Sequence, residues 1–370
     1  MDGLKEPSGK VEEIRAGFGS VAAILGNLLI LGVVVYAAVL AGSFPDLYYE
    51  SVQEDETLEW ASFWAFFVAA AAFLVAGVRQ RRATGRLAWF SMGVGLFCLF
   101  VAMEEVSWGQ RVLGYRPPEY FLEQNFQQEL NAHNVLGTSI RKLTLKGVIL
   151  GYGVLMPCLA FVPPLRRWFE RIGVPTPPWQ LAPAFLATYF LYEAYPWSHT
   201  GEWVELMLGL GFLFAAVTQA RGSQAGALLL VWIVVLSLGF STAAVSRNAR
   251  QDKPELLAAA QIEVEALRRD FASGQVNSQC NLHKRLYTFM EKYRQFNLLE
   301  GEFSRLTNQG LPEARADFLL DPWNSPYWIR DRCEDGRRVA FVYSFGPNRR
   351  RESSRWEILG DDIGAIIREK

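Results

Sequence analysis

The sequence predicts a membrane-embedded α-helical bundle of about seven spans, followed by a small α+β domain. Long uncharged apolar runs fill the first part of the chain, and many Trp and Tyr residues lie near their ends, where such rings favour the membrane–water boundary. Beyond residue 250 these runs give way to amphipathic and alternating patterns typical of a folded, water-exposed domain. A chain of 370 residues is long enough for two domains, which we place at 1–249 and 250–370.

The predicted spans follow from the length of the apolar runs. A helix needs about 20 mainly apolar residues to cross the hydrocarbon core of a membrane. Runs of roughly this length lie near residues 21–41, 60–78, 87–103, 147–164, 181–197, 203–220 and 225–245. Glu193 and Pro196 interrupt the fifth run, and Glu205 lies near the start of the sixth. In the fourth, Gly147 and Gly151 have the spacing that allows close contact with a neighbouring helix.

Charges in the loops predict the orientation, because Lys and Arg are enriched in short cytoplasmic loops. Basic residues follow the second, fourth and sixth spans: Arg79, Arg81, Arg82, Arg86, Arg166, Arg167, Arg171 and Arg221. The loop after the first span has no Lys or Arg and carries acidic residues instead: Asp46, Glu50, Glu54, Asp55, Glu56 and Glu59. Only Arg141, Lys142 and Lys146 oppose this pattern, at the end of a long loop where the rule is less decisive. We therefore expect a cytoplasmic N-terminus and an external C-terminal domain.

The C-terminal domain is predicted to begin with a helix at Pro254, since proline suits the first turn of a helix. A second helix is expected over residues 282–296. Residues 327–332 and 339–345 alternate as strands do, and Glu334-Asp335-Gly336 between them predicts the turn of a hairpin.

Two short motifs stand out in this domain: Asp321-Pro322-Trp323-x-x-Pro326-Tyr327, which is specific, and Gly360-Asp361-Asp362-Ile363, which is less so. Through them the domain resembles the major pseudopilin of bacterial type II secretion, well over roughly the last fifty residues and loosely over the sixty before them. The resemblance implies a periplasmic, pseudopilin-like α+β head on the bacterial inner membrane. As partners it implies secretion or pilus-like proteins, in addition to membrane lipids.

The chain departs from that family in one respect that bears on function. Pseudopilins begin with a basic leader, a peptidase cleavage site and a glutamate just inside the apolar helix. Neither the N-terminus nor residues 221–225 show that arrangement. We therefore expect the head to stay joined to the membrane bundle and not to become a fibre subunit.

The resemblance also implies a calcium site, because the last loop of the pseudopilin head binds calcium through carboxylates and carbonyls. Asp361 and Asp362 stand where acidic ligands are expected, and hard oxygen ligands suit this ion. However, residues 347–352 replace the acidic, glycine-rich loop of the family and include three adjacent arginines that would repel Ca²⁺. The alternative is that Asp361 and Asp362 cap a turn or a terminal helix.

The chain contains four cysteines, two in the C-terminal domain and two in predicted spans. An oxidising periplasm would permit a disulfide between Cys280 and Cys333, which are the cysteines of the C-terminal domain. Cys98 and Cys158 lie in predicted spans and are expected to pack there as apolar side chains.

The membrane domain carries a polar cluster on the predicted outer side. Its candidate catalytic residues are Glu104, Glu105, His133, His199, Glu202 and Glu205, accompanied by Ser107, Gln110, Asn125, Glu129, Asn131 and Glu193. Ionisable groups at membrane depth are costly and are usually paired or functional. His133 and His199 with some of the glutamates could hold a divalent transition metal such as Zn²⁺, Mn²⁺ or Fe²⁺, whose bound water could act in hydrolysis or transfer.

Two other interpretations of this cluster are open. Arg111 and Arg141 could neutralise the glutamates in a buried ion-pair network. The cluster could also form a polar groove for a lipid head group, a peptide or a partner helix.

The sequence leaves open whether the protein is an enzyme. The first hypothesis is an interaction module in which the bundle anchors the head, and the second is a membrane-embedded, metal-dependent hydrolase or transferase. A transporter is less well supported, because the polar residues gather at one boundary and not at the membrane midplane. A net charge of -1 argues against nucleic-acid binding. The basic residues Arg337, Arg338 and Arg349–Arg351 suggest a solvated face or a contact with anionic lipid.

Overall fold

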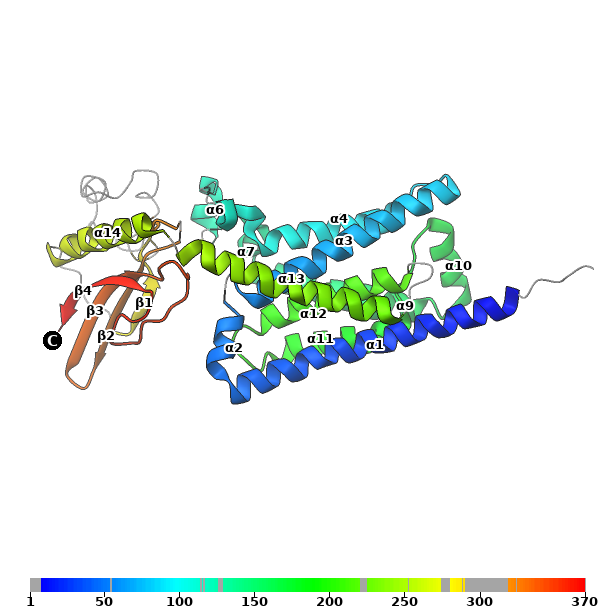
Figure 1. Ribbon diagram of the computed structural model, residues 1–370, viewed down its shortest axis with the longest axis horizontal. Helices are drawn as coiled ribbons and strands as arrows, with labels where there is room; N and C mark the ends of the chain where they lie inside the picture. Colours follow the sequence, from blue (N-terminus) through cyan, green and yellow to red (C-terminus); the bar gives the residue numbers. More distant parts are fainter. Residues whose placement is uncertain are drawn as a thin grey trace, which may run out of the picture. The chain divides into compact units, whose positions relative to one another are not determined.

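The computed structural model describes residues 8–53, 55–113, 115, 117–125, 129–219, 225–251, 253–273, 280–287, 289, 319–323 and 325–369. The chain forms two compact units, which we call the bundle unit and the head unit (Figure 1). The bundle unit comprises Met1–Trp108 and Leu136–Ala244, and the head unit comprises Gly109–Val135 and Val245–Lys370. The loop that follows the third predicted span thus groups with the C-terminal residues.

The bundle unit is helical. Its elements are α1 (Ser8–Ser43), α2 (Pro45–Ser51), α3 (Thr57–Thr84), α4 (Trp89–Glu105), α8 (Thr138–Leu150), the π-helical turn η2 (Gly151–Leu155), α9 (Met156–Leu159), α10 (Pro163–Ile172), the 3₁₀ turn η3 (Trp179–Leu181), α11 (Ala182–Ala194), α12 (Thr200–Gln219) and most of α13 (Ala225–Gln251). The short elements η1 (Ser107–Gly109), α5 (Gln110–Leu113), α6 (Glu119–Gln124) and α7 (Ala132–Val135) lie in the loop after α4.

Helices lie at all seven positions where the apolar runs predict spans. Among the described residues, five are long and apolar enough to cross a membrane: Ile24–Ser43, Thr57–Thr84, Ser139–Leu159, Thr200–Thr218 and Leu229–Asn248. The other two predicted spans coincide with α4, of 17 residues, and α11, of 13 residues. The helical bundle is therefore confirmed, with five helices of spanning length.

Small residues let the helices of the bundle pack closely. A Cβ atom added at Gly209 of α12 would lie 3.0 Å from Ala65 Cβ of α3, and one at Gly153 of η2 would lie 2.0 Å from Phe185 of α11. The sequence pointed instead to Gly147 and Gly151, but an added Cβ there would meet no described atom within 4 Å. Close contact in this region is made by Gly153, within the π-helical turn η2, and not by Gly147 or Gly151.

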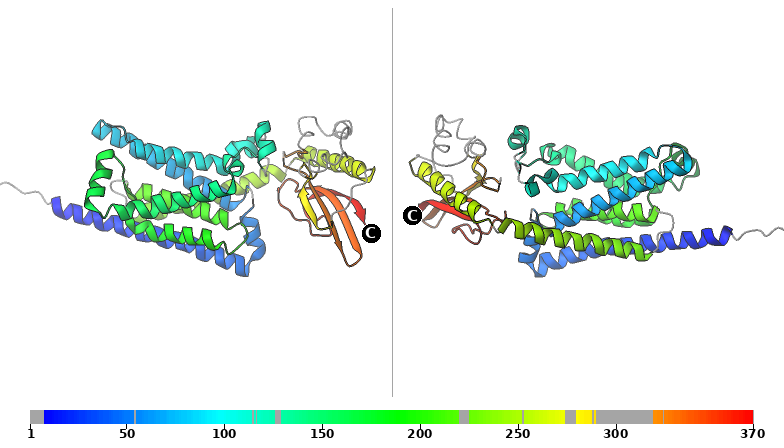
Figure 2. Two further views of the ribbon diagram at one scale, coloured as in Figure 1. Left: turned by 180° about the vertical axis from the view of Figure 1, so that it is seen from behind. Right: turned by 45° about the horizontal axis from the view of Figure 1, so that its top comes forward.

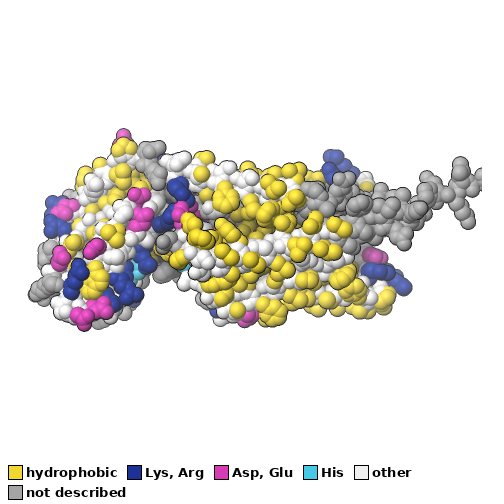
Figure 3. Space-filling view, turned by 60° about the horizontal axis from the view of Figure 1, so that its bottom comes forward, with side chains coloured by type: hydrophobic (Ala, Val, Ile, Leu, Met, Phe, Trp, Pro, Cys, Tyr) yellow, Lys and Arg dark blue, Asp and Glu magenta, His cyan; other side chains and the backbone are white. Residues whose placement is uncertain are grey.

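Apolar side chains cover the outside of the bundle as well as its core. On α1 and α13, Leu28, Val35, Leu230 and Phe240 are all more than half exposed. Figure 3 shows that hydrophobic side chains dominate this face. An exposed apolar surface of this extent suits contact with lipid.

The head unit contains α14 (Pro254–Ser273) and a four-stranded antiparallel sheet in the order β1 (Leu282–Arg285), β2 (Trp328–Glu334), β3 (Arg337–Ser344) and β4 (Ile363–Glu369) (Figure 2). The helix expected at Pro254 and the hairpin are both confirmed. The hairpin turn consists of Asp335 and Gly336, both with positive φ (48° and 80°), as tight two-residue hairpin turns require.

The predicted helix over 282–296 is wrong at its start. Leu282–Arg285 form β1, which pairs with β2 so that Leu282 lies opposite Asp331. Pairing with a strand almost fifty residues away overrides the local helical pattern, since β structure depends on cross-strand neighbours. Residues 290–296 lie outside the described residues.

Both faces of the sheet are covered. On one face, Ile329 and Val342 pack against Val264 and Leu267 of α14. On the other, Phe341 and Tyr343 pack with Trp356 and Ile358, which belong to the segment between β3 and β4. We call residues 345–362 the β3–β4 segment; the polar groups discussed below lie on it and on the sheet.

Candidate functional site

Glu104 and Glu105 are the last two residues of α4, and both are buried (5% and 9% exposed). Trp108 Nε1 donates a 2.6 Å hydrogen bond to Glu104 Oε1. Ser107 and Trp108 have positive φ values (46° and 56°), which are unfavourable for residues with side chains. Strained backbone of this kind is concentrated at functional sites, so the end of α4 is a candidate site on structural grounds.

His199, Glu202 and Glu205 lie at the start of α12. Glu202 and Glu205 are one helical turn apart, as their spacing predicts, and Glu202 is in the first turn, where the helix dipole favours an anion. His199 lies just before the helix with a φ of 58°, and its side chain is exposed. Thr200 anchors this start: its hydroxyl donates to Trp197 O (2.6 Å) and accepts from Trp197 N (3.2 Å).

Asp55 and Glu56, just before α3, are additional buried carboxylates that the sequence interpretation missed. The backbone N–H of Asp55 donates to Glu59 in the first turn of α3. The sequence signal was the acidic run after the first span, which we used only to predict orientation. Charge counting does not distinguish a solvated carboxylate from a buried one.

These carboxylates gather at one end of the bundle unit. Helices α3 and α4 pack against each other, as do α3 and α12. Figures 1 and 2 show that α3 and α12 begin, and α4 ends, at the same end of the bundle. Each of Glu56, Glu104, Glu105, Glu202 and Glu205 has an interaction partner within the protein. Among the described residues, no three His, Cys, Asp or Glu side chains are arranged to hold a metal ion.

Glu193 has a partner that the sequence interpretation did not name. It forms an ion pair with Lys146 Nζ, which joins α11 to α8. Arg111 and Arg141 are the cations named by the ion-pair interpretation; the side chain of Arg111 lies outside the described residues, and Arg141 does interact within the protein. Glu193 is thus in an ion pair, but its partner is a lysine and both side chains are partly exposed (33% for Lys146 and 39% for Glu193).

His133 belongs to α7 in the head unit, whereas His199 belongs to the bundle unit. The polar residues around His133 fold their own loop. Asn125 Nδ2 donates to Glu129 O (2.6 Å) and to Asn131 Oδ1 (2.8 Å), and the N–H of Leu130 donates to Gln110 Oε1 (2.7 Å). These buried amides therefore have a structural role in the loop.

The Asp321 motif forms a buried hydrogen-bond network in the head unit. Asp321 is fully buried, and its Oδ1 accepts the N–H groups of Trp323 (3.0 Å) and Ser325 (2.8 Å). Its Oδ2 accepts the Ser344 hydroxyl (2.5 Å) at the end of β3. Burial raises the pKa of Asp321 to about 6, although these hydrogen bonds oppose the rise. The motif thus fixes the chain before β2 to the end of β3.

Asp361 and Asp362 occupy different environments. Asp362 is buried, and its Oδ2 accepts the N–H groups of Glu352 (3.1 Å) and Ser353 (2.7 Å). Burial raises the pKa of Asp362 to about 6. Asp361 is exposed, and its Oδ2 accepts from Asn348 Nδ2 (3.2 Å). The two bonds to backbone N–H groups support the turn-stabilising interpretation for Asp362.

A hollow of about 720 Å³ lies beside these two aspartates and is lined by α14, β4 and the β3–β4 segment. Pro347, Gly360, Asp361 and Asp362 form its loop side. Arg349 is directed elsewhere, since its Nη2 donates to Trp323 O (2.9 Å). Arg349, one of the three adjacent arginines, therefore points to Trp323 and not to the aspartates.

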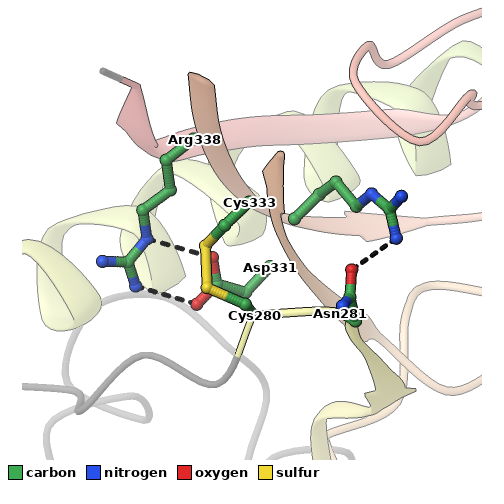
Figure 4. The surroundings of a disulfide bond; sticks show 6 residues. Cys280, Asn281, Asp331, Cys333 and Arg338 are labelled. Atoms are coloured by element: carbon green, nitrogen blue, oxygen red, sulfur yellow. Dashed lines mark hydrogen bonds and ion pairs between the residues drawn. A yellow bond between two sulfur atoms is a disulfide. The ribbon is translucent and has the colours of Figure 1, made fainter. Parts of the chain in front are cut away.

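Cys280 and Cys333 form a disulfide with their Cα atoms 5.1 Å apart, as the sequence allowed. Figure 4 shows the bond between the start of β1 and the end of β2. Beside it, Arg338 Nη2 forms an ion pair with Asp331 Oδ2 (3.0 Å). Of the other cysteines, Cys98 is buried in α4, whereas Cys158 is exposed on the surface of α9.

No protein-family model, curated protein or solved structure matches this chain. The resemblance of the head unit to pseudopilins therefore remains a prediction from its motif residues.

Proposed function

We propose that this protein is an integral membrane protein that presents a permanently attached, pseudopilin-like head as an interaction module for type II secretion-like or pilus-like machinery. The observation that carries this proposal is the position of the motif that resembles pseudopilins. Asp321 and Tyr327 lie fully buried in the head and bond to β3 and α14 respectively. The motif therefore belongs to the core of the head and not to a surface loop, which supports the proposal.

The proposal includes seven spans, with α4 and α11 crossing the membrane beside the five longer helices. An odd number of spans places the two ends of the chain on opposite sides, and the loop charges favour a cytoplasmic N-terminus. The Cys280–Cys333 disulfide supports a periplasmic head, since disulfides persist in oxidising compartments. On this basis we assign the protein to the bacterial inner membrane.

Cysteine labelling tests the orientation. In a Cys98→Ala, Cys158→Ala background, single cysteines at Ser43 and Gly222 are exposed to a membrane-impermeant maleimide added to intact spheroplasts. Ser43→Cys should react and Gly222→Cys should react only after lysis. Reaction at Gly222→Cys alone would invert the proposed topology.

In-cell photo-cross-linking tests the docking function. A photoreactive residue replaces Leu359 or Ile366, which are exposed apolar side chains of the head. Ile262, exposed on α14, provides a matched position on the other side of the sheet. Cross-links from at least one head position to a pseudopilin or another secretion component support docking. If no position captures such a component, the docking function is wrong.

A metal-dependent hydrolase or transferase is the second candidate function. The observation in its favour is the strained backbone at Ser107 and Trp108, which directly follow the buried Glu104 and Glu105. His199, just before α12, has a positive φ as well. Metal analysis of the purified protein, compared with His199→Ala and Glu202→Ala, tests it. A stoichiometric transition metal that is present in the wild type and lost in the variants would support an enzyme. If the wild type holds no such metal and the variants are as stable as the wild type, the enzyme candidate is removed.

Calcium binding by Asp361 and Asp362 is part of the proposal for the head. Among the described residues, Asp362 Oδ1 has no hydrogen-bond donor, so this oxygen is free to coordinate a cation. Calcium should raise the unfolding temperature of the full chain but not of Asp361→Asn, Asp362→Asn. An equal response in both proteins, or none in the wild type, would leave the aspartates with a turn-stabilising role only.

A further inference from the structure

Helix α10 lies at one end of the bundle unit and follows a helix of spanning length. It begins at Pro163, four residues after the end of the spanning helix Ser139–Leu159. Gly173, with a φ of 73°, ends it in the left-handed conformation common at helix C-termini. Figures 1 and 2 show that α10 runs across this end of the bundle, where α3 ends and α4 begins. A helix that follows a span in this way lies at the boundary of the membrane.

The two faces of α10 differ in character. Phe169 is buried, and Leu165 and Ile172, one turn away on each side, are half-buried. Trp168 is more than half exposed beside them. The polar face carries four exposed charged residues: Arg166, Arg167, Glu170 and Arg171. An apolar face that includes Trp, opposite a polar face rich in Arg, is typical of helices that lie on the surface of a lipid bilayer.

A hydrogen bond attaches the end of α10 to the start of α4. Trp89 Nε1, in the first turn of α4, donates to the carbonyl oxygen of Ile172 at 2.6 Å. Arg86 precedes Trp89 by three residues, in the turn between α3 and α4. Arg171 directly precedes Ile172. The hydrogen bond therefore brings the chain at Arg86 and the chain at Arg171 to one place on the surface.

Cations far outnumber carboxylates in the two segments that meet here. Residues 79–92 and 160–182 contain one carboxylate, Glu170, and seven exposed arginines: Arg79, Arg81, Arg82, Arg86, Arg166, Arg167 and Arg171. Glu170 forms an exposed ion pair with Arg166 at 3.9 Å, which leaves the excess of positive charge in place. Trp89 and Trp168, both more than half exposed, belong to the same two segments. An anionic membrane surface complements both features, since Arg pairs with phosphate and Trp favours the membrane–water boundary.

We propose that α10 and the turn between α3 and α4 form a binding site for the head group of an anionic phospholipid, with Arg86 and Arg171 as its phosphate ligands. Guanidinium groups bind phosphate oxygens through paired, charge-assisted hydrogen bonds, so two of them can hold one phosphate. The hydrogen bond from Trp89 to Ile172 keeps the two arginines at this site. The inference rests on the membrane-embedded bundle of the proposed function, but neither on its orientation nor on the head.

Native mass spectrometry of the full chain in a neutral detergent tests this site. Phosphatidylglycerol and zwitterionic phosphatidylcholine are added separately, and the apparent Kd of each is measured. The variant Arg86→Gln, Arg171→Gln removes the two proposed ligands. The control Lys142→Gln, Lys253→Gln removes the same charge from two exposed lysines, one in α8 and one between α13 and α14. Thermal unfolding verifies that each variant keeps its fold.

The wild type should bind phosphatidylglycerol more tightly than phosphatidylcholine. The arginine variant should bind phosphatidylglycerol about thirtyfold more weakly, since each basic residue near an anionic lipid surface contributes about fivefold in affinity. The lysine control should bind as the wild type does. Equal affinity of the wild type for the two lipids, or an equal loss in the arginine variant and the lysine control, would overturn the proposal.

Glycerol 3-phosphate, added without lipid, distinguishes a lipid site from a site for a soluble phosphate ester. If the wild type binds glycerol 3-phosphate and does not prefer phosphatidylglycerol, the ligand is a soluble ester and the lipid assignment is wrong. Failure of the lipid site would leave the docking function of the head standing, because photo-cross-linking tests that function independently.

Discussion

Tyr327 Oη donates a 2.7 Å hydrogen bond to Glu263 Oε2, which joins the last residue of the Asp321 motif to helix α14. Both side chains are buried, and a buried carboxylate is stable only when hydrogen bonds replace its lost hydration. The contact fixes α14 against the chain that enters β2, so the motif positions the helix as well as the strands.

Tyr327→Phe should destabilise the head because it leaves Glu263 with one hydrogen bond fewer in a buried position. Loss of a hydrogen bond to a buried charged group lowers the free energy of unfolding by about 1.5–3 kcal/mol. Urea unfolding of the full chain, with proteolysis of the head as the readout, measures the change in the free energy of unfolding. Tyr120→Phe, at an exposed tyrosine of α6, is the control and should be neutral. Equal stability of Tyr327→Phe and wild type would show that the hydrogen bond contributes nothing net.

Asp321 should make the head less stable as the pH rises from about 4 to about 7. Its pKa is raised from 3.8 to about 6 in the folded state, so the folded head binds a proton that the unfolded chain has already released. The stabilisation is fully present below the unfolded pKa and is lost as the pH rises through the folded pKa, by an amount on the order of 3 kcal/mol.

Asp321→Asn isolates this effect, because an amide keeps the shape of the side chain and does not titrate. Subtracting its pH profile of stability from that of the wild type removes other contributions, including the opposite slope expected from His283, whose pKa is lowered to about 4. The wild type should lose stability relative to Asp321→Asn between pH 4 and 7. A constant difference over this range would mean that Asp321 titrates as an ordinary carboxyl group.

Removal of the Cys280–Cys333 disulfide should destabilise the head. The bond closes a loop with a sequence separation of 53 residues, for which loop-closure entropy predicts about 4 kcal/mol. Cys280→Ser, Cys333→Ser should unfold at a lower temperature than the wild type and should no longer respond to a reducing agent. Cys98→Ala, Cys158→Ala is the control and should keep the full response to reduction. A reductant-insensitive wild type would contradict the disulfide.

Gly153→Ala should weaken the packing of η2 against α11, since the new Cβ would overlap Phe185. Overpacking typically costs about 1–3 kcal/mol. Gly151→Ala adds the same methyl group two residues away, where an added Cβ meets no described atom within 4 Å. Thermal unfolding in detergent should show a lower midpoint for Gly153→Ala only. Equal midpoints for the two variants would argue against close contact at Gly153.

Local patterns in the sequence predicted much of the fold. The apolar runs gave the positions of the helices because spanning length and hydropathy are properties of single segments. Asp335-Gly336 gave the hairpin because its backbone preferences are local. Strand β1 was not predictable in this way, since Leu282 is in a strand only because residue 331 pairs with it.

The candidate sites were predicted less completely. The sequence located Glu104, Glu105, Glu202 and Glu205, and the bundle brings the ends of α3, α4 and α12 to one end. It missed Asp55 and Glu56, because burial depends on which helices pack together.

The sequence by itself determined that the chain has apolar helices of membrane-spanning length and a C-terminal domain with a helix and a hairpin, since each of these depends on residues close together in the chain. Only the tertiary structure decided that Leu122, in the loop after α4, packs with Leu320 in the head unit. It also decided that Cys280 bonds to Cys333, and that Asp321 accepts the Ser344 hydroxyl. The physical reason is that burial and pairing arise between distant segments, and no local period or turn records which of them will meet.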